Sequence, residues 1–220
     1  MPSMIRAVIF DLDGVLIESE QLWDAARRSV VAAHGGHWRD DATAAMQGMS
    51  SVEWGEYLHD TLHVALPTDE IIGLVVDDLL SRYRQHLPLL PGAVEAVRRL
   101  GAQWPLGLAS SSNRDVIDAV LRLADLDDAF AVTLSSEQVA HGKPEPDVYL
   151  EVSARLAEPP PDCAAVEDST NGIRSAVAAG CRVIAVPNRD YPPDETVLGA
   201  AAVVLRDLGG LTVDVVDGLG

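Results

Sequence analysis

The chain has 220 residues, of which 48% are hydrophobic and 23% are charged, so it is long enough for one α/β core with a smaller insert. Its 34 acidic and 16 basic residues give a net charge of -18. That charge opposes nucleic acid and anionic membranes by long-range repulsion, so we expect neither partner, and an anionic ligand would need strong local cations.

The composition also predicts the compartment. The first residues lack the apolar segment of a signal peptide, and no run reaches the roughly 18 apolar residues that span a bilayer. Cys163 and Cys181, the two cysteines, each stand alone in an apolar setting, which is typical of free buried thiols. We therefore expect a cytoplasmic protein, with a monomer as the default.

The first predicted element is a buried strand over residues 5–10, followed directly by Asp11, Leu12, Asp13 and Gly14. Because side chains alternate along an extended strand, Asp11 and Asp13 point to the same side. Two carboxylates this close are costly unless a cation lies between them or one binds a proton. The pair therefore predicts a chemical site; a solvated turn is the alternative, since Asp and Gly are common turn residues.

Helical patterns come next, and then strands alternate with helices. Between residues 19 and 87 no convincing strand appears, and helices are predicted over 22–33, 52–62 and 69–86. Further strands are predicted over 106–109, 131–134, 164–166, 183–186 and 202–205. Helices between them are predicted over 93–100, 115–123, 148–156 and 172–179.

This alternation predicts an α/β fold, a Rossmann-like doubly wound parallel sheet covered by helices on both faces. The helical segment that follows the first strand predicts an inserted α-helical cap over the carboxyl edge of the sheet. We expect a core of residues 1–17 and 89–220 and a cap of residues 18–88.

A hydroxyl cluster follows the strand at 106–109. Ser110, Ser111, Ser112 and Asn113 lead from this strand into a helix, where free backbone N–H groups favour anions. Ser110 lies nearest the strand end, so we expect it to bind an anion. Simple N-capping is the alternative for Ser112 and Asn113.

Two later segments add a cation and two acids. Only one of the 16 basic residues is a lysine, Lys143, which lies between Gly142 and Pro144. A site that needs a compact point charge on a flexible stem selects Lys over Arg. Glu167 and Asp168 follow the strand at 164–166, where either carboxylate could complete an oxygen-rich site with Asp11. Such hard ligands favour Mg²⁺, and helix capping is the alternative.

Together these segments resemble the four ordered motifs of the haloacid dehalogenase superfamily, and the resemblance covers essentially the whole chain. The motifs are Asp11-Leu12-Asp13-Gly14-Val15-Leu16, Ser110, Gly142-Lys143-Pro144-Glu145-Pro146 and Glu167-Asp168-Ser169. A helical cap between the first and second motifs, of the type called C1, is similar to the branch that holds β-phosphoglucomutase and many small phosphatases.

The resemblance implies a role for each motif. Asp11 would be the nucleophile that forms an aspartyl phosphate, and Asp13 the general acid and base. Mg²⁺ would be held by the Asp11 side chain, the Asp13 backbone carbonyl and Asp168, with Glu167 acting through water. Ser110 and Lys143 would bind the transferring phosphoryl group of a small-molecule phosphate ester. The remaining predicted phosphate or substrate contacts are Ser111, Asn113, Gly48 and Ser50.

Three functions remain open at this point. A β-phosphoglucomutase would place Lys and Arg at positions 47 and 51 of the cap to grip a second phosphate, but this chain has Gln47 and Ser51. Arg114 could partly replace them. We expect a phosphomonoester phosphatase, with the mutase as the first alternative and a catalytically silent phosphate-binding domain as the second. Trp23 and Trp54 are expected to pack within the cap, although either could face the active-site cleft.

Overall fold

The sheet contains six parallel strands in the order β3-β2-β1-β4-β5-β6. The computed structural model describes residues 4–46, 49–189 and 192–220. The strands are β1 (Ala7–Phe10), β2 (Leu106–Ser110), β3 (Val132–Ser135), β4 (Cys163–Glu167), β5 (Arg182–Ala185) and β6 (Val203–Val204). The chain adds strands on one side of β1 and then on the other, so the order reverses between β1 and β4. Open α/β sheets bind ligands beyond the strand ends at such a point.

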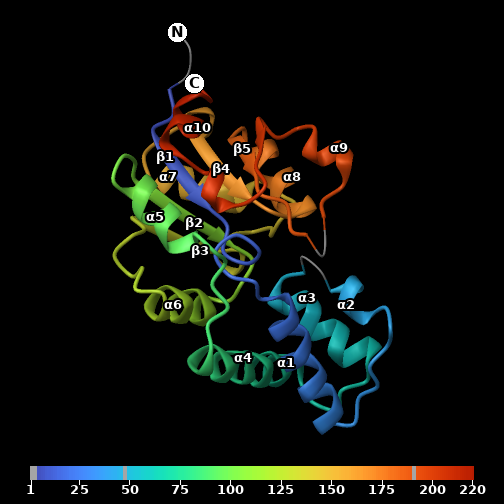
Figure 1. The fold of residues 1–220 in the computed structure, drawn as a ribbon. Helices are drawn as coiled ribbons and strands as arrows, with labels where there is room; N and C mark the ends of the chain where they lie inside the picture. Colours follow the sequence, from blue (N-terminus) through green and yellow to red (C-terminus); the bar gives the residue numbers. More distant parts are fainter. Residues whose placement is uncertain (1–3, 47–48, 190–191) are drawn as a thin grey trace.

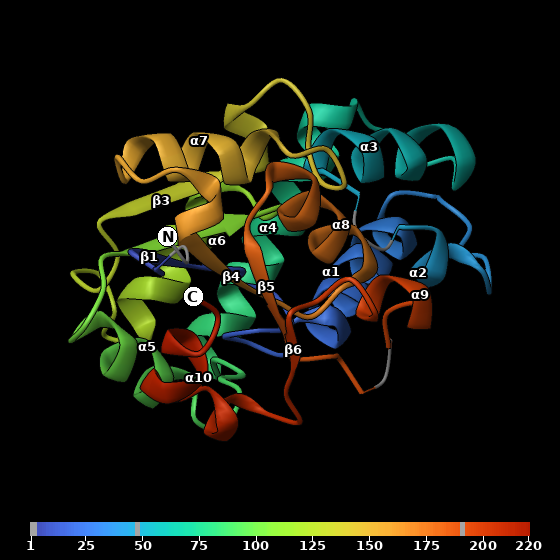
Figure 2. The same cartoon turned by 90° about the horizontal axis from the view of Figure 1, so that it is seen from above.

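Helices cover both faces of this sheet, as Figure 2 shows for α7 and α5. The helices of the core are α5 (Ala93–Gly101), α6 (Arg114–Leu123), α7 (Asp147–Arg155), α8 (Thr170–Ala179), α9 (Glu195–Leu198) and α10 (Val213–Asp217). Alternation along β1 divides its side chains between two cores: Val8 and Phe10 join the core that includes α5 and α6, and Ile9 joins that of α7 and α8. This confirms the predicted α/β fold.

The cap lies at the end of the molecule opposite both chain termini (Figure 1). It consists of α1 (Glu20–Ala33), α2 (Ala42–Ala45), α3 (Ser51–Glu56) with a π-helical turn (Tyr57–Thr61), and α4 (Thr68–Gln85). Short helices such as α2 and α9 were not predicted, because four residues are too few to show a helical period.

Two adjacent backbone segments join the cap to the core. The Glu18 N–H donates to the Pro88 carbonyl at 2.8 Å, and the Leu90 N–H donates to the Leu16 carbonyl at 2.9 Å. The division into a core and a cap at 18–88 stays a prediction, and these two crossings lie at its boundaries. One hydrophobic cluster runs continuously from the sheet into the cap, so the cap is packed onto the strand ends.

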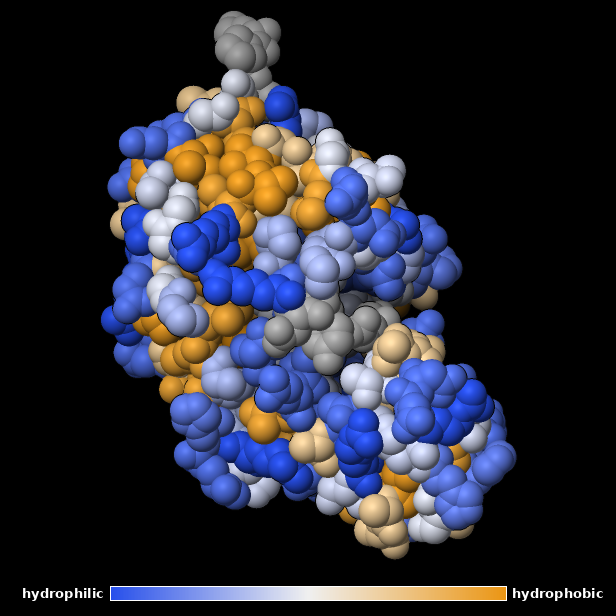
Figure 3. Space-filling model, turned by 45° about the vertical axis from the view of Figure 1, so that its right-hand side comes forward, coloured by the Kyte–Doolittle hydropathy of each residue, from blue (hydrophilic) through white to orange (hydrophobic). Residues whose placement is uncertain are grey.

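The cysteines and the molecular surface can be compared with the expectations from composition. Cys163 and Cys181 are buried free thiols, as expected. The cap surface is mainly hydrophilic on the face shown in Figure 3, while apolar residues gather on the core. Within the described ranges, no helix combines the length and the apolar composition that a membrane span requires.

Candidate active site

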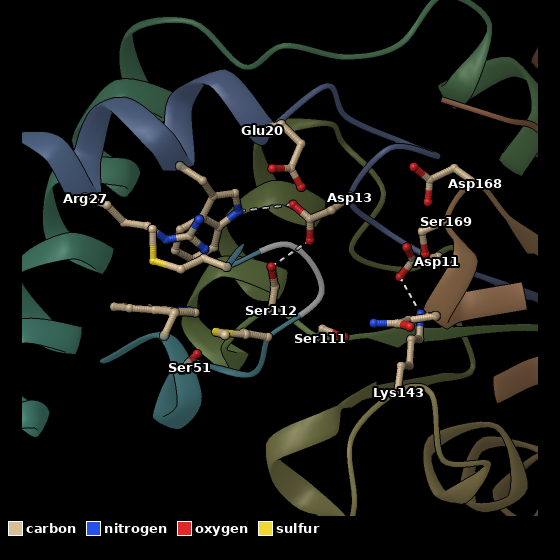
Figure 4. A pocket seen from close by; sticks show the side chains of 15 residues that line it. Asp11, Asp13, Glu20, Arg27, Ser51, Ser111, Ser112, Lys143, Asp168 and Ser169 are labelled. Atoms are coloured by element: carbon tan, nitrogen blue, oxygen red, sulfur yellow. Dashed lines mark hydrogen bonds and ion pairs between the residues drawn. The ribbon is translucent and has the colours of Figure 1, made fainter. Parts of the chain in front are cut away.

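Three neighbouring strands bring the predicted site residues to one edge of the sheet. Asp11 directly follows β1, while Ser110 and Glu167 end β2 and β4, the two strands that flank β1. The Asp11 N–H donates to the Val166 carbonyl at 3.0 Å, which ties the start of the first motif to β4. Figure 4 shows Asp11, Lys143 and Asp168 grouped at one end of a pocket.

Lys143 is the buried cation of this group. Its Nζ donates to Asp11 Oδ1 at 2.9 Å, to Glu167 Oε1 at 2.6 Å and to the Ala109 carbonyl at 3.0 Å. Three acceptors use all three ammonium protons. Burial alone would lower the pKa of Lys143, but the Asp11 and Glu167 carboxylates outweigh it and raise this pKa above its usual range. The side chain therefore stays charged.

Glu167 is the fully buried partner of this cation. Besides Lys143, its Oε1 accepts from the Tyr149 hydroxyl at 2.7 Å, and its Oε2 accepts from the Asp168 N–H at 3.1 Å and from Ser169. A Cβ at Gly172 would lie 2.0 Å from the carboxylate, so only glycine fits there. Since both oxygens already have partners, a water-mediated metal contact by Glu167 would have to displace one of them.

Asp11, Glu167 and Asp168 form a buried acidic cluster in which one ligand atom from each lies within 4.8 Å of the others. Among the described residues, Asp168 Oδ1 is buried and has no hydrogen-bond partner. Burial raises the pKa of Asp11 to about 7 against the opposing charge of Lys143, and burial also raises the pKa of Asp168 well above its usual range. The single positive charge of Lys143 cannot balance three carboxylates, and their hard oxygen atoms suit Mg²⁺.

Asp13 faces the cap instead. Its Oδ1 accepts hydrogen bonds from the Ser19 hydroxyl and from Trp23 Nε1, the latter at 3.3 Å, and its Oδ2 accepts from Ser112 Oγ at 2.6 Å. Figure 4 shows this carboxylate turned toward Ser112 and away from Lys143. The two motif aspartates therefore have different surroundings, one beside a buried cation and one at the base of the cap.

The sequence of this chain is similar to those of known hydrolases. Residues 5–180 match the family model described as haloacid dehalogenase-like hydrolase. The chain belongs to the haloacid dehalogenase-like hydrolases. It is 37% identical over 218 residues to hexitol phosphatase B of Escherichia coli K12, covering 96% of each chain. It is 30% identical over 203 residues to the phosphorylated carbohydrates phosphatase of Thermotoga maritima, covering 91% of this chain and 94% of that one.

Solved structures place this hydrolase in the same branch. CbbY from Rhodobacter sphaeroides in complex with phosphate superposes with a TM-score of 0.86 at 26% identity, covering 97% of this chain and 100% of that one. A putative β-phosphoglucomutase from Thermotoga maritima superposes with a TM-score of 0.75 at 29% identity, covering 96% of this chain and 98% of that one. The predicted family, its phosphoglucomutase- and phosphatase-like branch, and a phosphatase-type hydrolase are confirmed.

Three of the predicted contacts, Ser110, Asn113 and Ser50, are not among the residues that line the pocket. Ser110 is fully buried, and its Oγ accepts from the Ser112 N–H at 3.0 Å, whereas Ser111 lines the pocket. Asn113 donates to Glu137 at 2.8 Å, and Ser50 caps α3; neither lines the pocket. Only the amide nitrogen of Asn113 is used in this way, since its Oδ1 is buried and has no hydrogen-bond partner among the described residues. Substrate contacts by Asn113 and Ser50 stay predictions. Gln47 and Gly48 lie outside the described residues.

Arg114 is also engaged. Its guanidinium donates to the Thr133 carbonyl at 3.0 Å and to Thr133 Oγ1 at 2.7 Å, and it pairs with Asp118. It does not line the pocket. The structure therefore lends no support to Arg114 as a replacement for the missing cap cations, because three of its donors bind β3 and its own helix.

Residues of the cap form one wall of the pocket, and sequence patterns predicted only some of them. The pocket, of about 110 Å³, is closed on its cap side by Glu20, Trp23, Arg27, Met46, Met49, Ser51 and Trp54, here called the cap wall. Trp23 and Trp54 both face the pocket, in addition to packing in the cap. Glu20, Arg27 and Ser51 were missed. A signal existed for Arg27, which follows Trp23 by four residues and so shares the buried face of α1.

Proposed function

We propose that this hydrolase is a Mg²⁺-dependent phosphatase that removes the phosphoryl group from a small phosphorylated carbohydrate through an aspartyl phosphate on Asp11. The observation that carries the proposal is the contrast between the two motif aspartates. Asp11 is buried against Lys143, while Asp13 faces the cap, where a leaving group would lie. The names of the relatives, a hexitol phosphatase and a phosphorylated carbohydrates phosphatase, support the substrate class.

In the first step, a carboxylate oxygen of Asp11 attacks phosphorus while the bond from phosphorus to the leaving oxygen breaks. Asp13, in its protonated form, gives its proton to that oxygen, so the product leaves as a neutral alcohol. Lys143 holds the opposite Asp11 oxygen and so orients the nucleophile.

In the second step, Asp13 accepts a proton from a water molecule whose oxygen attacks the same phosphorus. The bond between phosphorus and Asp11 breaks, inorganic phosphate is released, and Asp13 again carries the proton for the next cycle. Because one carboxyl group donates and then accepts, no further acid or base is required.

The acidic cluster fits a divalent cation. The side chains of Asp11 and Asp168 and the backbone carbonyl of Asp13 would hold Mg²⁺, and the orphaned Asp168 Oδ1 is a ligand atom with no other partner among the described residues. When bound, the ion would supply positive charge for the phosphoryl oxygens. Ser111, which lines the pocket, is a proposed hydroxyl contact, and Ser110, which accepts from the Ser112 N–H, keeps its own hydroxyl hydrogen as a donor for a phosphoryl oxygen.

A mutase is the second candidate, because a putative β-phosphoglucomutase is among the similar structures. Transfer between two positions of a sugar passes through a bisphosphate, which needs cations for the second phosphate. Ser51 stands where the mutase pattern has Arg, and Arg114 is bound to Thr133 and Asp118. Both observations support the phosphatase.

Phosphate release from a panel of phosphomonoesters tests the proposal. The panel includes sorbitol 6-phosphate, β-glucose 1-phosphate and p-nitrophenyl phosphate, each measured with Mg²⁺ and with chelator, for the wild type and Asp11→Asn. We expect Mg²⁺-dependent release that the substitution lowers by at least about 10⁴-fold. Isomerisation of β-glucose 1-phosphate faster than any hydrolysis would make the protein a mutase. No reaction with any ester would leave the silent phosphate-binding domain.

The other expectations stay predictions. The monomer is the default for a cap of this size. The cytoplasmic location and the absence of nucleic-acid and membrane partners rest on composition and charge. Light scattering of the purified protein would test the monomer.

A further inference from the structure

Two buried polar groups of the cap wall lack partners within the described parts of the chain. Arg27 is 8% exposed and its Nε has no hydrogen bond, and Ser51 is 1% exposed and its hydroxyl has none. Both side chains line the pocket, as Figure 4 shows. Buried polar groups are normally paired, so two orphans on one wall indicate groups that a ligand would satisfy.

Two tryptophans hold the Arg27 guanidinium in place without using its hydrogen atoms. Its central carbon lies 5.1 Å from the Trp23 ring centroid and 5.2 Å from that of Trp54, and the two rings are 5.9 Å apart. Cation–π contacts of this kind stabilise the positive charge through the ring faces. The planar group is therefore oriented while its Nε–H has no partner among the described residues.

The charge around Arg27 is balanced by acids. Glu20 precedes Trp23 by three residues on α1 and faces the same pocket. Burial lowers the pKa of Arg27 to about 10, while the negative charges of Glu20, Asp24 and Asp13 oppose that change. Asp24 is paired with Arg28 at 2.6 Å, but Glu20 and Asp13 line the same pocket as Arg27, so the pocket offers hydrogen bonds but no net positive field on this side. A second phosphate would meet repulsion here, whereas neutral hydroxyl groups would not.

We propose that Arg27, Glu20 and Ser51 form a recognition site for the hydroxyl groups of an uncharged, polyhydroxylated leaving group, and that this site rejects bisphosphates. This inference rests on the proposed phosphatase function and names the residues that select its substrate. Arg27 donates to hydroxyl oxygens, Glu20 accepts from hydroxyl hydrogens and Ser51 does either, while Trp23 and Trp54 contact the carbon skeleton.

The test compares two leaving groups. Sorbitol 6-phosphate carries hydroxyl groups for the site, and p-nitrophenyl phosphate carries none on its leaving group. We expect Arg27→Met to lower kcat/KM for sorbitol 6-phosphate by about 10- to 100-fold, the loss of a hydrogen bond from a charged donor, and for p-nitrophenyl phosphate by less than about threefold. Arg84→Met, an exposed arginine on cap helix α4, is the matched control and should change neither value.

Two further measurements keep the inference falsifiable. If Arg27→Met does not fold by circular dichroism, Ser51→Ala and Arg27→Lys decide, and each should affect sorbitol 6-phosphate more than p-nitrophenyl phosphate. Wild-type hydrolysis of fructose 6-phosphate should exceed that of fructose 1,6-bisphosphate.

Three outcomes would overturn the inference. Equal losses on both leaving groups would give Arg27 a role in cap structure alone, and a preference for the bisphosphate would make the site a second phosphate site. A wild type inactive on every ester, p-nitrophenyl phosphate included, would instead remove the proposed function, and the inference with it.

Discussion

Gly14 and Asp168 approach each other so closely that no side chain fits between them. Gly14 has φ +79°, and a Cβ placed there would lie 1.9 Å from Asp168 Oδ2. The glycine therefore serves two needs, a left-handed backbone and space for a carboxylate. The tight turn after the nucleophile and the proposed metal ligand depend on each other.

Gly14→Ala should displace the Asp168 carboxylate and weaken Mg²⁺ binding by more than about tenfold, since the added methyl group occupies its place. Gly35→Ala is the matched control, because Gly35 has φ +75° but nothing within 4 Å of an added Cβ. The control should lose only about 1–2 kcal/mol of unfolding free energy, the cost of the backbone angle, and keep its Mg²⁺ affinity. Urea unfolding and Mg²⁺ titration measure both. Equal Mg²⁺ affinities in the two variants would contradict the proposed role of the contact.

Lys143→Met should destabilise the protein by about 3–5 kcal/mol near neutral pH, because Asp11 and Glu167 would lose their buried cation. Arg155→Met provides the comparison: Arg155 pairs with Glu151 at 2.8 Å, but the two side chains are 45% and 44% exposed. Removing that pair should cost less than about 1 kcal/mol. Chemical denaturation of both variants tests the difference, and similar losses would show that the buried charges are not coupled as the distances indicate.

Mg²⁺ should stabilise the protein more at alkaline than at acidic pH. Folding raises the pKa of Asp11 from 3.8 to about 7, so the folded protein binds this proton more tightly than the unfolded chain. Without metal, the stabilisation from this group is complete below pH 3.8, the pKa in the unfolded chain. It is lost as the pH rises through about 7, the pKa in the folded protein. Mg²⁺ binds the ionised carboxylate and competes with the proton.

The measurement is the rise in Tm on adding millimolar Mg²⁺ at about pH 5.5 and about pH 8, with the larger rise expected at the higher pH. Asp168→Asn should reduce the rise at the higher pH, since it removes a proposed ligand. The idea fails if the rise is the same at both pH values in the wild type.

Asp13→Asn should slow esters with poor leaving groups the most. A sugar alkoxide needs a proton as it leaves, and losing the general acid should lower kcat for sorbitol 6-phosphate by about 10²- to 10⁴-fold. The p-nitrophenolate ion leaves without a proton, so the rate of the first step should fall less for p-nitrophenyl phosphate. Ser112→Ala, which removes the 2.6 Å hydrogen bond to Asp13, should act in the same direction but more weakly. Equal effects on both esters would exclude Asp13 as the acid.

Several parts of the site could be predicted because they depend on local order along the chain. The alternation of strands and helices predicts a parallel sheet, and parallel strands end at one edge, so Asp11, Lys143 and Asp168 could be expected to converge. Their partners could not be assigned in the same way. Glu167 was expected near a metal, yet its carboxylate also accepts from Tyr149, 18 positions before it in the chain.

The sequence by itself determined the fold class, the family resemblance and the strand-end acids, because periodicity and motif spacing are properties of neighbouring residues. Only the tertiary structure decided which face each cap residue presents. Arg27 contacts both Trp23 and Trp54, which come from two helices, and Asn113 is bound to the exposed Glu137, 24 positions later in the chain. Contacts between residues far apart in the chain depend on how helices pack, and helical period alone does not specify that packing.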